Sequence, residues 1–384
     1  MKRNLKSFAR RSAGILAIFA LLVGAYLILS LQRLQVDSAS LRSTKAIAAE
    51  LVERKLLPSI SYAVIENGQI GAVETAGIAD FATGDPVTDE TLYEAASLTK
   101  PVVAELARRL HKQGLFDLDE AVSDTISLDR ISDRGAGQKI TPRQLLSHST
   151  GLPNWSGDNR NPARKDALDL RFKPGYAFQY SGEGYGFLLA FLEAKSGKSA
   201  DALAHEMFNE LGMVNSTLVG RGHKGHFARG HWGVSPDRQP WKTSAPIAAY
   251  SLFTNAEDYA RFVQYVMQNH AADLVSGNPF PVVHINVNPT ASDHDTEALG
   301  WSLGWGTLEQ KERSVYFQWG DNGAFRSFAA FDPKSGNAIV YFSNGSYGTL
   351  FADELAQPTL GDITTASSWF ADPIKEIART WLRY

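Results

Sequence analysis

The chain has 384 residues, 44% of them hydrophobic, and a formal net charge of −3. This length and hydrophobic content are enough for one large domain, or two lobes, with a substantial core. The sequence contains no cysteine, which excludes disulfide bonds, thiolate metal sites and a cysteine nucleophile.

The N-terminus differs from the rest of the chain. Five basic residues precede a nearly uninterrupted apolar run from Ala13 to Leu31. This run is long enough to span a bilayer and is rather long for the apolar part of a cleaved signal peptide. We therefore predict a transmembrane signal anchor over residues 1–33, a tether over 34–43 and a folded domain over 44–384. A cleaved signal peptide is the alternative, and both interpretations predict an exported protein.

The distribution of charge predicts the orientation and limits the partners. The positive-inside rule places the basic end in the cytoplasm, so we expect a single-pass inner-membrane protein whose domain is periplasmic or extracellular. Removing the five N-terminal basic residues from the total of 38 leaves 33 basic against 41 acidic residues. A body this acidic argues against nucleic acid as a partner.

The first part of the domain predicts a helix followed by a β-hairpin. The helix is closed by Pro58, and its buried stripe consists of Ile47, Leu51, Val52 and Leu56. The stretch 60–70 then contains a strand, an Asn-Gly turn and a returning strand, which is a strong hairpin pattern. Strand structure therefore precedes the next helix.

That next helix follows Ser97. Apolar residues recur at helical spacing from Leu98 to Leu110, and Gly114 ends the pattern. Ser97 would lie at the N-terminus of this helix, with Lys100 one turn further on the same face. The positive end of the helix favours negative charge developing near the serine, and an amine one turn along can relay its proton. A serine cap beside a solvated lysine is the other interpretation of these residues alone.

The remaining elements predict the fold class. The middle of the chain, about 117–245, has the pattern of helices and irregular loops, including a short helix that starts at Pro142. A helix over 256–267 precedes three strand-like runs, which lie near 313–319, 325–331 and 337–343. A last helix opens at Pro373 and is expected to bury Ile374, Ile377, Ala378 and Trp381. We predict an α+β fold with an antiparallel sheet formed from both ends of the chain, flanked by helices, and a mainly helical inserted lobe.

Three short segments follow one another in the order of a known family. They are Ser97 to Lys100, Tyr180-Ser181-Gly182 and Gln318-Trp319-Gly320. Together they resemble the Ser-x-x-Lys, Tyr-x-Asn and Lys-Thr-Gly or His-x-Gly blocks of the serine β-lactamase and penicillin-binding protein superfamily, on its class C-like and esterase side. The resemblance runs from about residue 45 to the C-terminus.

The resemblance implies a covalent mechanism. Ser97 would attack an acyl carbon and form an acyl-enzyme. Lys100 and Tyr180 are the candidate bases, and we treat them as a coupled pair without choosing between them. The backbone N–H groups of Ser97 and Asp321 would form the oxyanion hole.

The other residues of the pattern would line the substrate site, with Gln318 and Trp319 in its wall beside Gly320 and Gly182. Two of them depart from the family. Gly182 replaces a common Asn and removes an amide that would contact substrate, and Gln318 replaces a common Lys or His that is associated with binding a carboxylate and keeping the Tyr ionised. These departures favour a neutral ester or amide as substrate.

Two alternatives stay open. One is a D-amino-acid peptidase or β-lactamase acting on cell-wall-like substrates, and the other is a membrane-tethered sensor or pseudoenzyme that is acylated without turnover. We expect no cofactor and no metal, because the spacing of His223, His226 and His231 fits no common metal site. His148 is expected to be a structural loop histidine. Four tryptophans are candidates for pocket walls: Trp155, Trp301, Trp305 and Trp319.

Overall fold

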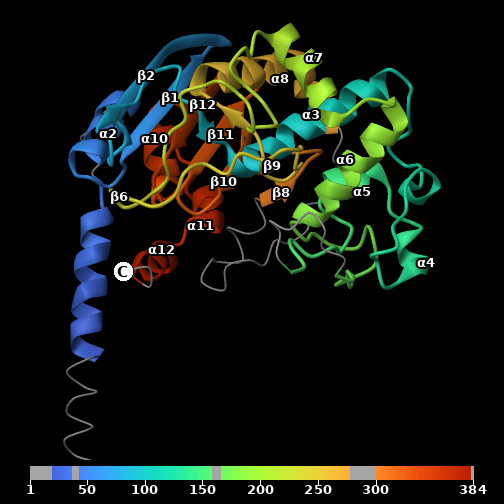
Figure 1. Cartoon of the computed structure of the whole chain (residues 1–384), viewed down its shortest axis with the longest axis horizontal. Helices are drawn as coiled ribbons and strands as arrows, with labels where there is room; N and C mark the ends of the chain where they lie inside the picture. The colour runs from blue at the N-terminus through green and yellow to red at the C-terminus, as the bar shows by residue number, and fades with distance from the viewer. Residues whose placement is uncertain (1–19, 37–42, 158–165, 277–298, 382–384) are drawn as a thin grey trace, which may run out of the picture.

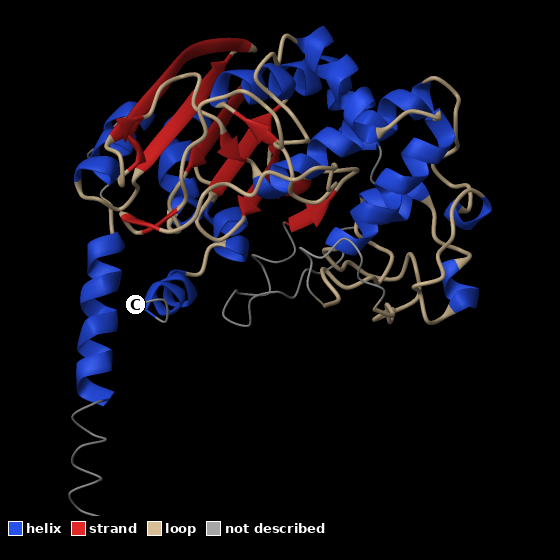
Figure 2. Cartoon of the chain, in the orientation of Figure 1, coloured by secondary structure: helices blue, strands red, loops and turns tan. Residues whose placement is uncertain are grey.

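The computed structural model describes residues 20–36, 43–157, 166–276 and 299–381. Its centre is an eight-stranded sheet with the order β3-β2-β1-β12-β11-β10-β9-β8, in which neighbouring strands are antiparallel (Figures 1 and 2). β1 (Ser59–Glu66) pairs with β12 (Asn337–Ser343), so the sheet joins both ends of the domain, as predicted. The other strands of this sheet are β2 (Gln69–Asp80), β3 (Asp85–Pro86), β8 (Leu299–Trp301), β9 (Gly306–Gln310), β10 (Arg313–Asp321) and β11 (Arg326–Asp332).

Helices cover both faces of the sheet, and the alternation of side chains along the strands separates two cores. Tyr62 of β1 lies in the core beneath α2 (Thr44–Glu53) and α10 (Ala352–Leu360). The next residue, Ala63, lies in the opposite core, which α8 (Ala256–Ser276) and the helical lobe cover (Figure 2). The prediction of a sheet flanked by helices is confirmed.

The predicted hairpin is confirmed together with its turn. Asn67 and Gly68 connect β1 to β2, and both have positive φ, at 51° and 78°. A two-residue turn with this conformation matches the twist of the two strands, and Asn and Gly adopt it at the lowest cost.

The inserted lobe is mainly helical, as predicted, and lies at the far side of the sheet from the N-terminus (Figure 1). Its short predicted helix is α5 (Pro142–Leu146), which Thr141 and Gln144 close with a reciprocal capping box. The longer helices of this part are α3 (Thr99–Lys112), α6 (Gly182–Ser196) and α7 (Ala200–Leu211), with short elements η2 (Val122–Asp124) and α4 (Arg134–Gly137) between them. Two small strand pairs lie outside this helical part (Figure 1): β4 (Tyr93–Glu94) with β7 (Phe253–Thr254), and β5 (His231–Trp232) with β6 (Ser235–Pro236).

The C-terminal part corrects one expectation. Four elements follow β12 in the described chain: η3 (Gly348–Phe351), α10, α11 (Thr364–Phe370) and α12 (Pro373–Trp381). α12 begins at Pro373 as predicted, but Ile374 is 57% exposed and Ala378 is exposed, while Ile377 is buried. The predicted buried stripe is therefore wrong at Ile374 and Ala378, because this helix turns Glu376 and Ile377 towards the body instead. The side chain of Trp381 lies outside the described ones.

The N-terminal segment is described only from residue 20. Residues 20–34 are helical and extend away from the body (Figure 1). Within the described ranges, no helix is both long and apolar enough for a membrane crossing, and the predicted span begins in residues 1–19, which lie outside those ranges. Of the predicted tether, Leu34 and Val36 pack against the core beneath α2, and 37–42 lie outside the described residues.

Candidate active site

Ser97 lies in a tight turn between the sheet and a helix. The 3₁₀ turn η1 (Ala96–Leu98) carries it, and α3 begins directly afterwards at Thr99. Ala96 has a positive φ of 48°, a conformation that costs energy for a residue with a side chain. Ser97 therefore lies at the N-terminal end of the helix, as predicted, in the strained 3₁₀ turn two residues before the first α-helical residue.

Gly320 allows β10 to lie against this turn. A Cβ at position 320 would clash with the hydroxyl of Ser327 and come within 2.5 Å of the Ala95 carbonyl oxygen. Ser327 Oγ donates a hydrogen bond to that same carbonyl over 2.7 Å. The ends of β10 and β11 therefore hold the backbone just before Ser97, and only glycine fits at position 320.

Lys100 is buried next to Ser97. The residue is 1% exposed, and its Nζ donates to Ser97 Oγ over 3.1 Å and to the Ala249 carbonyl over 3.0 Å. The Nζ atom also lies 4.8 Å from the centroid of the Tyr180 ring. Burial lowers the pKa of Lys100 to about 7. A large fraction of this side chain is therefore a neutral amine near neutral pH, and a neutral amine at this distance can accept the proton of Ser97.

Tyr180 also contacts Ser97 through its side chain. Burial raises its pKa to about 12, although hydrogen bonds with Ser97 and Gln318 act in the opposite direction. The phenol is therefore protonated at neutral pH. Of the two candidate bases, the geometry and ionisation favour Lys100 as the proton acceptor and Tyr180 as a proton donor.

Gln318 holds Tyr180 in place. Its Nε2 donates to Tyr180 Oη over 2.9 Å and to the Ser97 carbonyl over 3.1 Å. The side chain is fully buried, and its Oε1 atom has no hydrogen-bond partner within the described part of the chain. The expectation that Gln318 lines the substrate wall is thus corrected: it lies behind Tyr180 and bridges the tyrosine to the Ser97 backbone.

Aromatic rings surround Tyr180. The ring centroids of Trp319 and Trp301 each lie 5.5 Å from that of Tyr180, the first tilted against it and the second edge-on. His148 lies 4.4 Å from Tyr180, accepts a hydrogen bond from Ser181 N, and has a pKa well below its ordinary value, mainly because it is buried. This environment supports the prediction that His148 is structural. Trp305, by contrast, packs in the core and is no pocket wall.

Asp321 ends β10 directly after Gly320. Arg326 and Arg379 both contact its carboxylate, which also accepts a hydrogen bond from Gly323 N over 2.8 Å. These contacts fix the side chain of Asp321, so its backbone lies in a defined position at the end of the strand. Its N–H as the second oxyanion donor stays a prediction.

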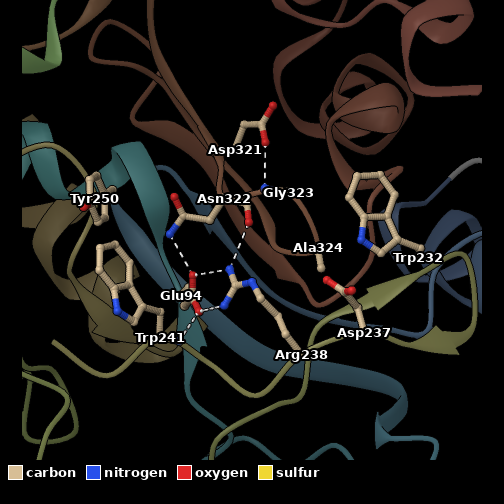
Figure 3. Close-up of a pocket in the computed structure, with 10 residues that line it drawn as sticks. All are labelled: Glu94, Trp232, Asp237, Arg238, Trp241, Tyr250, Asp321, Asn322, Gly323 and Ala324. Atoms are coloured by element: carbon tan, nitrogen blue, oxygen red, sulfur yellow. Dashed lines mark hydrogen bonds and ion pairs between the residues drawn. The ribbon is translucent and has the colours of Figure 1, made fainter. Parts of the chain in front are cut away.

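A cavity of about 280 Å³ opens beyond the end of β10 (Figure 3). At its base, Arg238 forms two parallel hydrogen bonds with Glu94, of 2.6 and 2.9 Å. Trp241 N and Asn322 Nδ2 donate to the same carboxylate over 2.6 and 2.8 Å. This buried group connects the strand before Ser97 to the 221–245 loop and to the turn after Asp321.

Sequence reasoning missed this group and most of its neighbours. Glu94 lies only three residues before Ser97, but its partner Arg238 is far away in the chain and belongs to a loop without a regular pattern. Ala249, the carbonyl partner of Lys100, has no side-chain signal at all. Trp155 was a candidate wall residue, but its contact with Gly182 was not foreseen.

The histidines with close spacing do not converge on a metal site. His231 accepts from Phe81 N and contacts Asn344, and His226 contacts Thr91. Among the residues that the structure describes, no group of three or more potential metal ligands is present.

Comparison with known proteins adds independent observations. A family model described as Beta-lactamase matches residues 44–360. The chain is 25% identical over 331 residues to penicillin-binding protein 4 of Amycolatopsis lactamdurans, covering 80% of this chain and 86% of that protein. It is 26% identical over 334 residues to a beta-lactamase of Providencia stuartii, covering 78% and 85%. For protein flp of Staphylococcus aureus the identity is 24%, over 75% of this chain and 60% of the relative.

Two solved structures show the same fold. The octameric penicillin-binding protein homologue from Pyrococcus abyssi has a TM-score of 0.68 at 19% identity, covering 89% of this chain and 79% of that chain. A class C beta-lactamase mutant has a TM-score of 0.64 at 22% identity, covering 82% and 95%. The predicted α+β architecture is confirmed.

Proposed function

The chain belongs to the beta-lactamase family, whose members are serine hydrolases that act through an acyl-enzyme, and we propose that this one cleaves a neutral ester or amide through an acyl group on Ser97. The observation that carries the proposal is the 3.1 Å contact between Lys100 Nζ and Ser97 Oγ, at a buried amine whose pKa is about 7. A nucleophile and a base within hydrogen-bond reach are the minimum that serine acylation needs.

The reaction follows from this arrangement. Neutral Lys100 takes the proton of Ser97 as Oγ bonds to the acyl carbon, and the carbonyl oxygen becomes an oxyanion facing the N–H groups of Ser97 and Asp321. The tetrahedral intermediate collapses and the bond to the alcohol or amine breaks. Tyr180 gives its proton to that leaving group and regains one from Lys100. Water then attacks the acyl carbon of acyl-Ser97. Tyr180 and Lys100 now transfer protons in the opposite direction, from the water to the departing Ser97 oxygen.

Gln318 supports a neutral substrate. Its side chain carries no charge, and its amide hydrogens are already directed at Tyr180 and at the Ser97 carbonyl. It therefore supplies no cation for a substrate carboxylate. The names of the relatives favour the cell-wall alternative, a D-amino-acid peptidase or β-lactamase. The two proposals predict different rates for a substrate that carries a carboxylate.

Gln318→Lys tests this choice. We expect the wild type to turn over neutral esters faster than benzylpenicillin, because a charge-assisted contact is worth about 1.5–3 kcal/mol and its absence costs about ten- to hundredfold in kcat/KM. The ammonium of the variant can still donate to Tyr180 and to the Ser97 carbonyl, so p-nitrophenyl acetate should be little changed. Its charge would attract the carboxylate of benzylpenicillin from this buried position, which should recover part of the loss for that substrate. A wild type that prefers benzylpenicillin would favour the cell-wall alternative. A burst of one equivalent of product per protein molecule, with no further turnover, would favour the acylated sensor.

The location is part of the proposal. An exported protein anchored in the inner membrane by its N-terminus agrees with the basic residues before the apolar run. It also agrees with the exposure of Leu21, Leu22 and Leu29, which are 73%, 65% and 65% exposed on the N-terminal helix. The domain would then act on substrates in the periplasm or outside the cell.

A further inference from the structure

We propose that Trp155 determines the acyl-group specificity of the Ser97 site. The indole takes the space of a side chain at position 182 and selects acyl groups with a flat, apolar part over acylamino groups. This inference rests on the proposed hydrolase function and adds the substrate class to it.

The Trp155 ring and a side chain at position 182 cannot occupy the same space. A Cβ at Gly182 would come within 2.5–2.8 Å of three carbon atoms of the Trp155 ring, which is closer than real Cβ contacts. Gly182 N also donates to the backbone carbonyl and the side-chain oxygen of Asn154, over 3.1 and 2.9 Å. The loop that carries Trp155 is therefore fixed on the first turn of α6, and any larger residue at 182 requires the ring to leave.

This pair lies beside the reacting groups. Gly182 is two residues after Tyr180, whose hydroxyl contacts Gln318 next to Ser97. Trp155 packs edge-on against Tyr250 at 5.7 Å between ring centroids. Tyr250 directly follows Ala249, the carbonyl partner of Lys100. The indole is thus connected on both sides to residues that position the nucleophile and its base.

Trp155, Tyr250 and Trp241 form a continuous aromatic wall. Tyr250 stacks on Trp241 at 5.4 Å with an interplanar angle of 23°. The rings of Tyr250 and Trp241 also line the cavity of about 280 Å³ beyond β10, where Figure 3 shows them side by side. These ring contacts therefore run from position 182 to the cavity, and we expect an acyl group on Ser97 to extend along them.

The chemistry of the wall defines the class of acyl group. Ring carbons give a flat group a large contact area, and glycine at 182 offers no side-chain donor or acceptor. An acylamino group would lose water from its N–H and C=O and find no side-chain partner at that position. We expect these effects together to give roughly ten- to hundredfold discrimination in kcat/KM.

Two esters with the same leaving group test the inference: p-nitrophenyl phenylacetate and the p-nitrophenyl ester of N-acetylglycine. The measured quantity is the ratio of their kcat/KM values in each variant relative to wild type, which cancels their intrinsic reactivities. The double variant Trp155→Ala/Gly182→Asn, in which the removed ring leaves room for an amide, should shift the ratio at least tenfold towards the acylamino ester. Trp155→Phe should keep most of the preference, and Tyr176→Ala, which removes an 81% exposed ring, should leave the ratio unchanged.

Labelling of Ser97 with a fluorophosphonate reports whether each variant has an intact site. A double variant that is labelled but keeps the wild-type ratio would overturn the role of Trp155. If the double variant is not labelled, Trp155→Ala alone decides, and a ratio within twofold of wild type would overturn the proposal. A wild type that neither takes the label nor hydrolyses either ester would instead contradict the proposed function.

Discussion

Lys100 is the residue whose ionisation controls the proposed chemistry. Its pKa of about 7 means that the amine is protonated in acid and neutral in base, and only the neutral form can accept the Ser97 proton. We therefore expect kcat/KM for a neutral ester to rise with pH through an apparent pKa near 7 and then reach a plateau. The plateau should persist up to high pH, because Tyr180 keeps its proton until about pH 12.

A pH profile of wild type and Lys100→Met checks this expectation. Removing the amine should lower kcat/KM about 10²–10⁴-fold, which is the usual contribution of a general base. An activity that falls as pH rises through 7, or a variant that keeps the wild-type profile, would assign the base to another group.

At the scale of elements, α12 is fastened to the end of β10. Arg326 is fully buried and joins the Asp321 carboxylate to Glu376 of α12, donating to Glu376 over 2.9 Å. Arg379 contacts both acids, at 2.8 Å from Glu376 and 3.3 Å from Asp321. The C-terminal helix therefore supports the residue whose N–H is expected to hold the oxyanion.

Glu376→Gln should weaken this support. We expect a loss of about 1.5–3 kcal/mol in the free energy of unfolding, since Arg326 is left without its buried anionic partner, and a fall in kcat with KM little changed. The matched control is Glu257→Gln, which breaks an exposed ion pair between Glu257 and Arg261 on α8 and should cost less than about 0.5 kcal/mol. If both substitutions change the free energy of unfolding and kcat by the same amount, Glu376 has no special role in positioning Asp321.

Element prediction succeeded where the signal was local. The Asn67-Gly68 turn, the short helix that starts at Pro142 and the three strand-like runs near the C-terminus each depend on neighbours in sequence. The contact of Trp155 with Gly182 and that of Arg326 with Glu376 join distant parts of the chain, so no periodicity reveals them. β8 and β9 were missed for a related reason, because such short strands have too few residues to show alternation.

At the scale of the whole molecule, the N-terminal helix leaves the body at a fixed point. Arg54, at the end of α2, donates to the carbonyls of Arg33 and Gln35, over 2.5 and 2.9 Å. Leu31 and Leu34 border a cavity of about 450 Å³ shared with Ala371 at the end of α11. The exposed leucines on this helix lie outside the body, in the segment that we propose enters the membrane.

Fractionation of cells tests the anchor. We expect the full chain to stay in the membrane fraction after a high-salt wash, because burial of apolar surface and not charge would hold it. A version that lacks residues 1–35 and is secreted with a separate signal should be soluble and hydrolyse the same ester. Soluble wild-type protein whose N-terminus begins beyond residue 30 would show a cleaved signal peptide instead.

The identity of the nucleophile is the claim on which the other inferences depend. The direct measurement is mass spectrometry of the purified protein after reaction with a fluorophosphonate, followed by digestion to locate the adduct. One adduct should form, on Ser97, and Ser97→Ala should show neither the adduct nor ester turnover. An adduct on another residue, or turnover that survives Ser97→Ala, would contradict the assignment of the active site.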